Sequence, residues 1–358
     1  MLTYLLRRLL LMIPTLLGIT VVVFAVMAMS PGGITAQTLV GGANMKPQEK
    51  QALMAYYNKR YGLDQPAPLQ YLRWLNNVSP IGFTQDENGK YAGFSVSKGM
   101  DLGTSFMYGR PVSEILAERI PITLLLNLIT IPLIYAIAIV VGVKAATERG
   151  KRFDVVSSVS MLALWSIPTM LAGVLLLGFF ANTQYFQWFP TAGISSRAAQ
   201  DMPFLPHLIN GAWVPGYLLD RLWHLVLPVI CLSYAGFAGL AKLTRTSVLE
   251  NLNADYARTA RAKGLAEQDV LWKHVFRNSL LPLITVSAGL LPSLLAGSLI
   301  VEYIFSINGM GQLAVEAVKG RDRELVLSIT WISGFLTLIG YLIADFCYTL
   351  ADPRVTYD

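Results

Sequence analysis

Residues 120–143 have the sequence IPITLLLNLITIPLIYAIAIVVGV. It carries no charged side chain, and it is longer than the roughly 20 apolar residues that a helix needs to cross the hydrocarbon core of a bilayer. The composition agrees, because hydrophobic residues make up 54% of the chain, charged residues only 14%, and the mean hydropathy is +0.50. The sequence therefore indicates a membrane protein.

Five further segments are long and apolar enough to span a bilayer: residues 9–29, 155–181, 222–241, 280–304 and 325–350. Backbone groups in lipid must find internal partners, and these segments lack the alternating polarity of barrel strands. We therefore predict an all-α membrane protein with six transmembrane helices. A signal peptide is the competing interpretation of residues 9–29, but a secretory apolar region has only about 7 to 15 residues.

Basic residues set the predicted orientation, since loops rich in Lys and Arg tend to stay cytoplasmic. Their density favours both termini inside, with residues 144–152 and 242–277 also inside. The weak point is the loop 306–324, which would place Lys319, Arg321 and Arg323 outside, offset by Glu316, Asp322 and Glu324. The predicted divisions are an N-terminal transmembrane helix (1–29), an extended extracytoplasmic region (30–119) and a five-helix core (120–358) with a cytoplasmic segment at 251–279.

The predicted extracytoplasmic region contains two helical patterns. One covers residues 47–61, begins with Pro47 and Glu49, and stops at Gly62. A second short helix surrounds Tyr71 and Trp74 at the membrane surface, where aromatic residues are common. Residues 76–100 are rich in Gly, Ser, Asn and Asp and are predicted to form a loop. The region is either a structural cap over the bundle or a contact for substrate or a partner.

The basic cytoplasmic segment is NLNADYARTARAKGLAEQDVLWKHVFRNSLLPLIT, residues 251–285. It predicts a short helix over 255–263 that Gly264 stops, followed by a second helix over 266–278. Val270, Leu271 and Val275 recur on one face of the second helix. Such a basic amphipathic segment is either a solvated or headgroup-facing surface or a dock for a soluble protein.

Polar residues inside the spans are candidates for a translocation pathway or gate. Glu302, near the outer end of its span, either contacts substrate or is a water-facing interfacial carboxylate. Thr123 and Asn127 lie at helical spacing and either line a passage or bond between helices. The remaining pathway candidates are Pro292, Ser293 and Ser298.

No catalytic site is predicted. The chain has no G-x-x-x-x-G-K-[ST] phosphate loop and no H-E-x-x-H zinc motif. We therefore expect a protein that is not an enzyme, holds no metal or cofactor and binds no nucleic acid.

Several ordered stretches make the chain resemble the permeases of binding-protein-dependent ABC importers, and more narrowly the first permease subunit of dipeptide and oligopeptide importers. These stretches are YLLRRL (4–9), YGLDQP (61–66), DLGTS (101–105), DYARTARAKG (255–264), HVFRNSLLP (274–282), VEYIFS (301–306), NGMG (308–311) and DPR (352–354). The general permease motif has Glu-Ala-Ala where this chain has Arg258-Thr259-Ala260. Permeases of peptide importers share this difference, so the chain resembles them more than it resembles importer permeases in general.

The resemblance implies a type I importer fold, in a bacterial inner membrane, that moves peptides by alternating access. Implied partners are membrane lipid, a second similar permease, an extracytoplasmic binding protein, and two ATPase subunits that would hold ATP and Mg²⁺. The helix that would couple the permease to the ATPase comprises Asp255, Tyr256, Ala257, Arg258, Thr259, Ala260, Arg261, Ala262, Lys263 and Gly264. Two alternatives stay open at this point: the same architecture importing nickel chelates or other small solutes, and a secondary transporter without a motor.

Overall fold

The computed structural model describes residues 2–30, 46–85, 91–209, 212–296 and 299–351. The chain forms two compact units, one of Met1–Arg119 with Leu313–Phe335 and one of Ile120–Gln312 with Leu336–Asp358. Each unit is described below on its own. The sequence-based division at residues 29 and 119 stays a prediction.

The first unit begins with α1 (Leu2–Met29), followed by α3 (Pro47–Tyr61) and α4 (Ala67–Val78). Its core joins Phe24 of α1, Trp74 and Val78 of α4, and Leu327 at the start of α14 (Arg323–Ala351). The predicted helix over 47–61 is confirmed, and Gly62 ends it in the left-handed conformation (φ +63°). The predicted short helix around Tyr71 and Trp74 is confirmed as α4, although Trp74 is buried.

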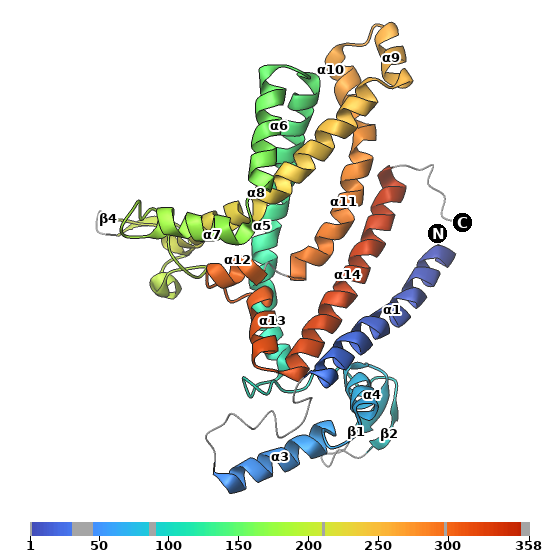
Figure 1. The fold of residues 1–358 in the computed structure, drawn as a ribbon, viewed down its shortest axis with the longest axis vertical. Helices are drawn as coiled ribbons and strands as arrows, with labels where there is room; N and C mark the ends of the chain where they lie inside the picture. Colours follow the sequence, from blue (N-terminus) through green and yellow to red (C-terminus); the bar gives the residue numbers. More distant parts are fainter. Residues whose placement is uncertain (1, 31–45, 86–90, 210–211, 297–298, 352–358) are drawn as a thin grey trace. The chain divides into compact units, whose positions relative to one another are not determined.

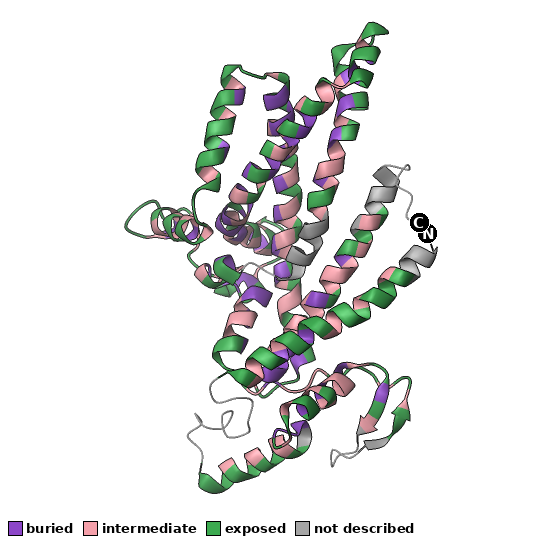
Figure 2. Ribbon diagram, turned by 45° about the vertical axis from the view of Figure 1, so that its right-hand side comes forward, coloured by how far each residue is buried: buried purple, intermediate pink, exposed green. Residues whose placement is uncertain are grey.

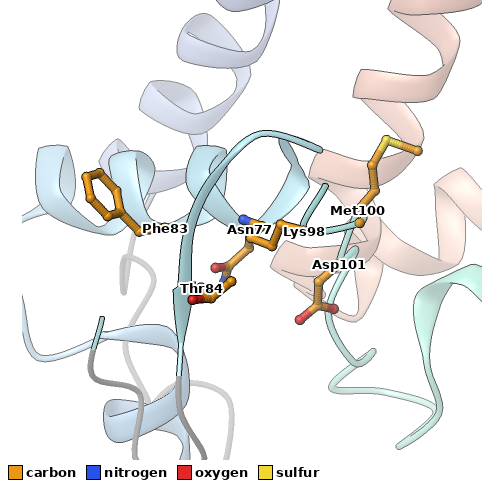
Figure 3. Close-up of a pocket in the computed structure, with 7 residues that line it drawn as sticks. Asn77, Phe83, Thr84, Lys98, Met100 and Asp101 are labelled. Atoms are coloured by element: carbon orange, nitrogen blue, oxygen red, sulfur yellow. The ribbon is translucent and has the colours of Figure 1, made fainter. Parts of the chain in front are cut away.

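The prediction that residues 76–100 form only a loop is wrong. Strands β1 (Gly82–Gln85) and β2 (Tyr91–Ser95) pair antiparallel, with Phe83 opposite Phe94. The Asn76 side chain at the end of α4 donates to the Phe83 carbonyl (2.9 Å) and accepts the Phe83 N–H (2.8 Å), which anchors the hairpin. Beside the hairpin is an open pocket of about 340 Å³, and Figure 3 shows Phe83 and Met100 at opposite ends of it.

The second unit contains most of α5 (Val112–Thr147) and its neighbours. Helices α6 (Arg152–Trp165), α7 (Thr169–Leu176) and α11 (Arg277–Ala296) pack against the long α8 (Gly216–Leu252). Figure 1 shows α9 (Asp255–Ala262) and α10 (Glu267–Asp269) together at the end of α8 and α11. The shorter elements are a π-helical turn (Leu177–Ala181), a 3-10 helix (Arg197–Asp201), β3 (His207–Ile209), β4 (Ala212–Val214), α12 (Leu299–Ile304) and α13 (Met310–Lys319), whose later part belongs to the first unit.

Four helices within the described residues are long and apolar enough to cross a membrane: Arg7–Met29, Val112–Thr147, Gly216–Leu252 and Arg323–Ile343. The helices Arg152–Trp165 and Thr169–Ala181 meet at an angle of 93°. Together they make a fifth candidate span if they are counted as one broken span. The predicted fifth span, residues 280–304, corresponds to α11 and α12, and residues 297–298 between them are not described.

The bend in the third predicted span lies at Pro168, because proline lacks an N–H and clashes with the preceding helical turn. The carbonyls of the residues on either side of Pro168 accept hydrogen bonds from α8. The Tyr234 hydroxyl donates to the Ile167 carbonyl (2.6 Å), and the Cys231 thiol donates to that of Thr169 (3.6 Å). Pro228 causes no such break, since it lies within a continuous α8.

Candidate functional site

The predicted coupling helix is formed as α9, which begins at Asp255 and ends at Ala262. Gly264 has φ +81°, a conformation that favours glycine. Its N–H donates to the Arg261 carbonyl (2.9 Å), and the Leu265 N–H donates to that of Ala260 (3.3 Å). The predicted stop at Gly264 is therefore confirmed.

One side of α9 is buried through two alanines. Ala257 and Ala260 are 0% and 5% exposed, and they join a cluster with Val143 of α5, Val248 of α8 and Val275. Small side chains at these two positions let the α9 backbone approach the ends of α5 and α8 closely. The buried side of α9 therefore belongs to the same apolar cluster as the ends of α5 and α8.

The other side of α9 is open and carries two basic side chains, Arg258 and, just after the helix, Lys263. Asp255, Tyr256, Arg258, Thr259, Ala262 and Lys263 are all exposed. Arg258 lies 3.7 Å from Asp255, in a pair too exposed to hold either side chain firmly. Arg261 differs, because it donates to Glu267 Oε1 (2.7 Å) and to the Leu252 carbonyl (3.1 Å). Arg261 thus ties α9 to its neighbours, while Arg258 and Lys263 remain available to a partner.

The prediction that a second helix covers 266–278 is wrong about where this helix ends, because the helical structure continues beyond Asn278. After α10, residues Val270–Phe276 form a π-helical turn that runs directly into α11. Spacing by five residues in a π-helix places Val270 and Val275 on one side, and both are 0% exposed. The chain therefore passes without a break from α10 into the fifth predicted span.

Thr123 and Glu302 meet at a second site in this unit. The Thr123 hydroxyl donates to Glu302 Oε1 (3.1 Å), and Glu302 Oε2 accepts the Gln312 N–H (3.0 Å). Thr123 Oγ1 in turn accepts the Met310 N–H (2.8 Å). Glu302 is only 1% exposed, so its interpretation as a water-facing interfacial carboxylate is wrong. Its role at a pathway or gate stays a prediction.

This site explains the two glycines of the NGMG stretch. A Cβ at Gly309 would lie 2.6 Å from both Glu302 Oε2 and Thr123 Oγ1, and one at Gly311 would lie 2.7 Å from the Leu299 nitrogen. Such distances are shorter than nonbonded atoms tolerate. Only glycine lets this turn sit against the carboxylate.

The remaining pathway candidates are not brought into this site by any described contact. The Asn127 amide donates to the Thr123 carbonyl of its own helix (3.1 Å). Pro292 and Ser293 lie in α11, where their side chains are not described, and Ser298 lies outside the described residues. Their part in a pathway stays a prediction.

The family description "Binding-protein-dependent transport system inner membrane component" matches residues 138–357, and its N-terminal counterpart matches residues 1–127. The chain belongs to this family. It is 37% identical, over 100% of both chains, to the oligopeptide transport system permease protein AppB of Bacillus subtilis. It is 31% identical to the inner membrane ABC transporter permease protein YejB of Escherichia coli O157:H7, over 99% of both chains. It is also 31% identical to the peptidoglycan transport system permease protein YejB of Agrobacterium fabrum, over 99% of this chain and 98% of the relative.

The predicted resemblance to importer permeases is therefore confirmed. The protein is a multi-pass inner-membrane permease subunit of a binding-protein-dependent transport system.

Near α9, the permease has an ion pair that the sequence did not reveal. Arg245 of α8 donates through Nε and Nη2 (2.8 Å) to the two oxygens of Asp154 in α6. The Gly150 N–H also donates to Asp154 (2.9 Å). This two-pronged contact joins the first turns of α6 to α8, about ten residues before α9 begins. No sequence signal pairs residues 91 positions apart.

In the first unit the permease buries three consecutive charged residues. Asp322, Arg323 and Glu324 are 0%, 1% and 2% exposed. Asp322 accepts the Ser105 hydroxyl (2.5 Å) and the Met107 N–H (3.0 Å), while Arg323 donates to Glu324 Oε1 (2.7 Å from Nε). Arg323 is therefore buried and paired with Glu324. Of the three basic residues that the orientation prediction placed in an exposed outer loop, Arg323 is not exposed.

Tyr61 and Gly103 complete this buried cluster. The Arg323 guanidinium lies 5.6 Å from the Tyr61 ring centre, and the Tyr61 hydroxyl accepts the Thr104 N–H (3.1 Å). Burial raises the pKa of Tyr61 to about 12, so its hydroxyl stays neutral at physiological pH. A Cβ on Gly103 would come within 2.9 Å of Glu324 Oε2. The YGLD and DLGTS stretches thus surround the start of α14.

Proposed function

We propose that this permease carries peptides inward across the bacterial inner membrane. Support for the cargo comes from the relative named as an oligopeptide transport permease, which aligns over the whole chain. A permease for nickel chelates or other small solutes, and a transporter without a motor, are not favoured by any of these relatives.

We propose that helix α9 contacts the ATPase. The observation that supports this is that one side of α9 is buried against the permease while the other side is exposed. Ala257 and Ala260 fix it to the ends of α5 and α8, and Arg258 and Lys263 project from the open side. A soluble ATPase that grips the open side would move the buried side with it. Two such ATPase subunits would bind ATP and Mg²⁺, because this chain has no phosphate loop of its own.

The full assembly in this proposal also contains a second, similar permease and an extracytoplasmic binding protein that delivers the peptide. The permease itself would cross the membrane six times with both termini cytoplasmic, so that α9 faces the motor. Closure of the ATPase pair would switch the bundle between two packed arrangements and so alternate access to the peptide path.

Reversing charge on the open side of α9 tests this proposal. The Arg258→Glu/Lys263→Glu double variant is expected to lose most of its bound ATPase, because like-charge contacts at an interface cost several kcal/mol. Co-purification of the ATPase subunits in lipid nanodiscs measures this, together with ATP hydrolysis stimulated by the binding protein. The matched control is Lys273→Glu, which changes an exposed lysine of the π-helical turn outside α9.

The control should recruit ATPase and respond to binding protein as the native chain does. If the double variant assembles and hydrolyses ATP normally, α9 is not the motor contact. Native protein that transports peptide in liposomes without any ATPase would refute the importer proposal itself.

A further inference from the structure

An apolar groove of about 480 Å³ lies in the first unit between the later part of α1 and the start of α4. From α1 it is lined by Val21, Phe24, Ala25, Ala28 and Met29, whose spacing places them on one helix face. From α4 it is lined by Ala67, Pro68, Tyr71 and Leu72. No charged side chain lines the groove.

The one polar side chain among these lining residues, Tyr71, has its hydroxyl hydrogen-bonded within the protein. The Tyr71 hydroxyl bonds Thr20 Oγ1 (3.0 Å) and reaches the Leu17 carbonyl (3.5 Å), so the ring presents an apolar surface. The Phe24 ring packs against Tyr71 with centres 5.4 Å apart. The groove has fixed walls but offers no polar group that would hold water in place.

The groove continues the exposed apolar surface of α1. This helix is one of the candidate spans, only 11% of its most apolar window is buried, and Figure 2 shows it largely exposed along its length. Val22 and Val26, beside the groove on α1, are 61% and 65% exposed. Residues 21–29 cover roughly 12 Å of helix at a rise of 1.5 Å per residue, which is a large part of one leaflet.

We propose that this groove binds an acyl chain of a membrane phospholipid, in the leaflet next to the Met29 end of α1. A groove open to the bilayer with apolar walls loses packing if it stays empty and gains nothing from water. The acyl chain would fill the space between α1 and α4 and so hold α4 at the membrane surface. The lipid is then a structural part of the unit that carries the β1–β2 hairpin.

Photolabelling tests this inference on the assembled transporter. The complex is reconstituted into vesicles of phosphatidylethanolamine and phosphatidylglycerol that contain a phosphatidylcholine with a diazirine in one acyl chain. After illumination, adducts are mapped by peptide mass spectrometry. We expect adducts on both groove walls, within residues 21–29 and 67–72.

Variants that fill the groove supply the specific readout. Ala25→Trp and Ala28→Trp are expected to lose the adducts on residues 67–72, whereas Val22→Trp, at the same depth but outside the groove, keeps them. Thermal melting of each purified complex checks that the variants are folded. Labelling of all faces of α1 without any on α4 would mean ordinary surrounding lipid and overturn the inference. An absence of adducts on both walls would do so too, since another protein would then cover the groove.

Discussion

Replacing Arg323 with methionine is expected to destabilise the permease by about 3–5 kcal/mol, the usual cost of breaking a buried ion pair. The change leaves the Glu324 carboxylate, which is 2% exposed, without the guanidinium that donates to it, while the Asp322 side chain nearby is 0% exposed. Arg323→Lys should restore only part of the loss, because an ammonium lacks the fork that donates to Glu324 through both Nε and Nη2. The measurement is thermal unfolding in detergent or nanodiscs.

Two further variants decide whether burial of the charge is the cause. Arg323→Met/Glu324→Leu removes both charges of the pair, and it should be clearly more stable than Arg323→Met alone. Arg110→Met breaks the exposed Arg110–Glu118 pair of the same unit, with side chains 48% and 55% exposed, and should leave the melting temperature almost unchanged. If Arg323→Met melts like the native permease, or no lower than Arg110→Met, the buried cluster does not stabilise the start of α14.

Local signals in the sequence were enough for most helices of this permease. Apolar runs predicted the candidate spans, Pro47 and Gly62 predicted α3, and Gly264 predicted the end of α9. The β1–β2 hairpin was missed because its strands have four and five residues and contain glycines, so their pattern resembles a loop. What holds the hairpin is the Asn76 side chain, a tertiary contact that no periodicity records.

The same holds for the candidate sites, where features set by neighbouring residues were predicted and features set by distant residues were not. Helix α9 was predictable because its cap, charges and length all lie within ten residues. The burial of Glu302 was not, since its partner Thr123 lies 179 positions away in the sequence. A carboxylate near the end of a span has the same sequence signal whether it faces water or the protein interior, and only packing decides between them.

Substituting Gly309 with alanine is the second change with a large expected effect. The new Cβ would lie 2.6 Å from Glu302 Oε2 and from Thr123 Oγ1, so the turn must move. That movement strains the hydrogen bonds from the Met310 N–H to Thr123 and from the Gln312 N–H to Glu302. Overpacking of this kind costs about 1–3 kcal/mol. We expect a lower melting temperature and reduced peptide uptake by the reconstituted transporter.

The matched control is Gly239→Ala in α8, where an added Cβ meets no heavy atom within 4 Å. Alanine is favoured over glycine in a helix by about 1 kcal/mol, so this variant should be as stable as the native permease or slightly more so. In a Glu302→Ala background, Gly309→Ala should cost less than in the native chain, because one of the two clashing groups is gone. Equal costs in both backgrounds would show that contact with the carboxylate is not what requires glycine at position 309.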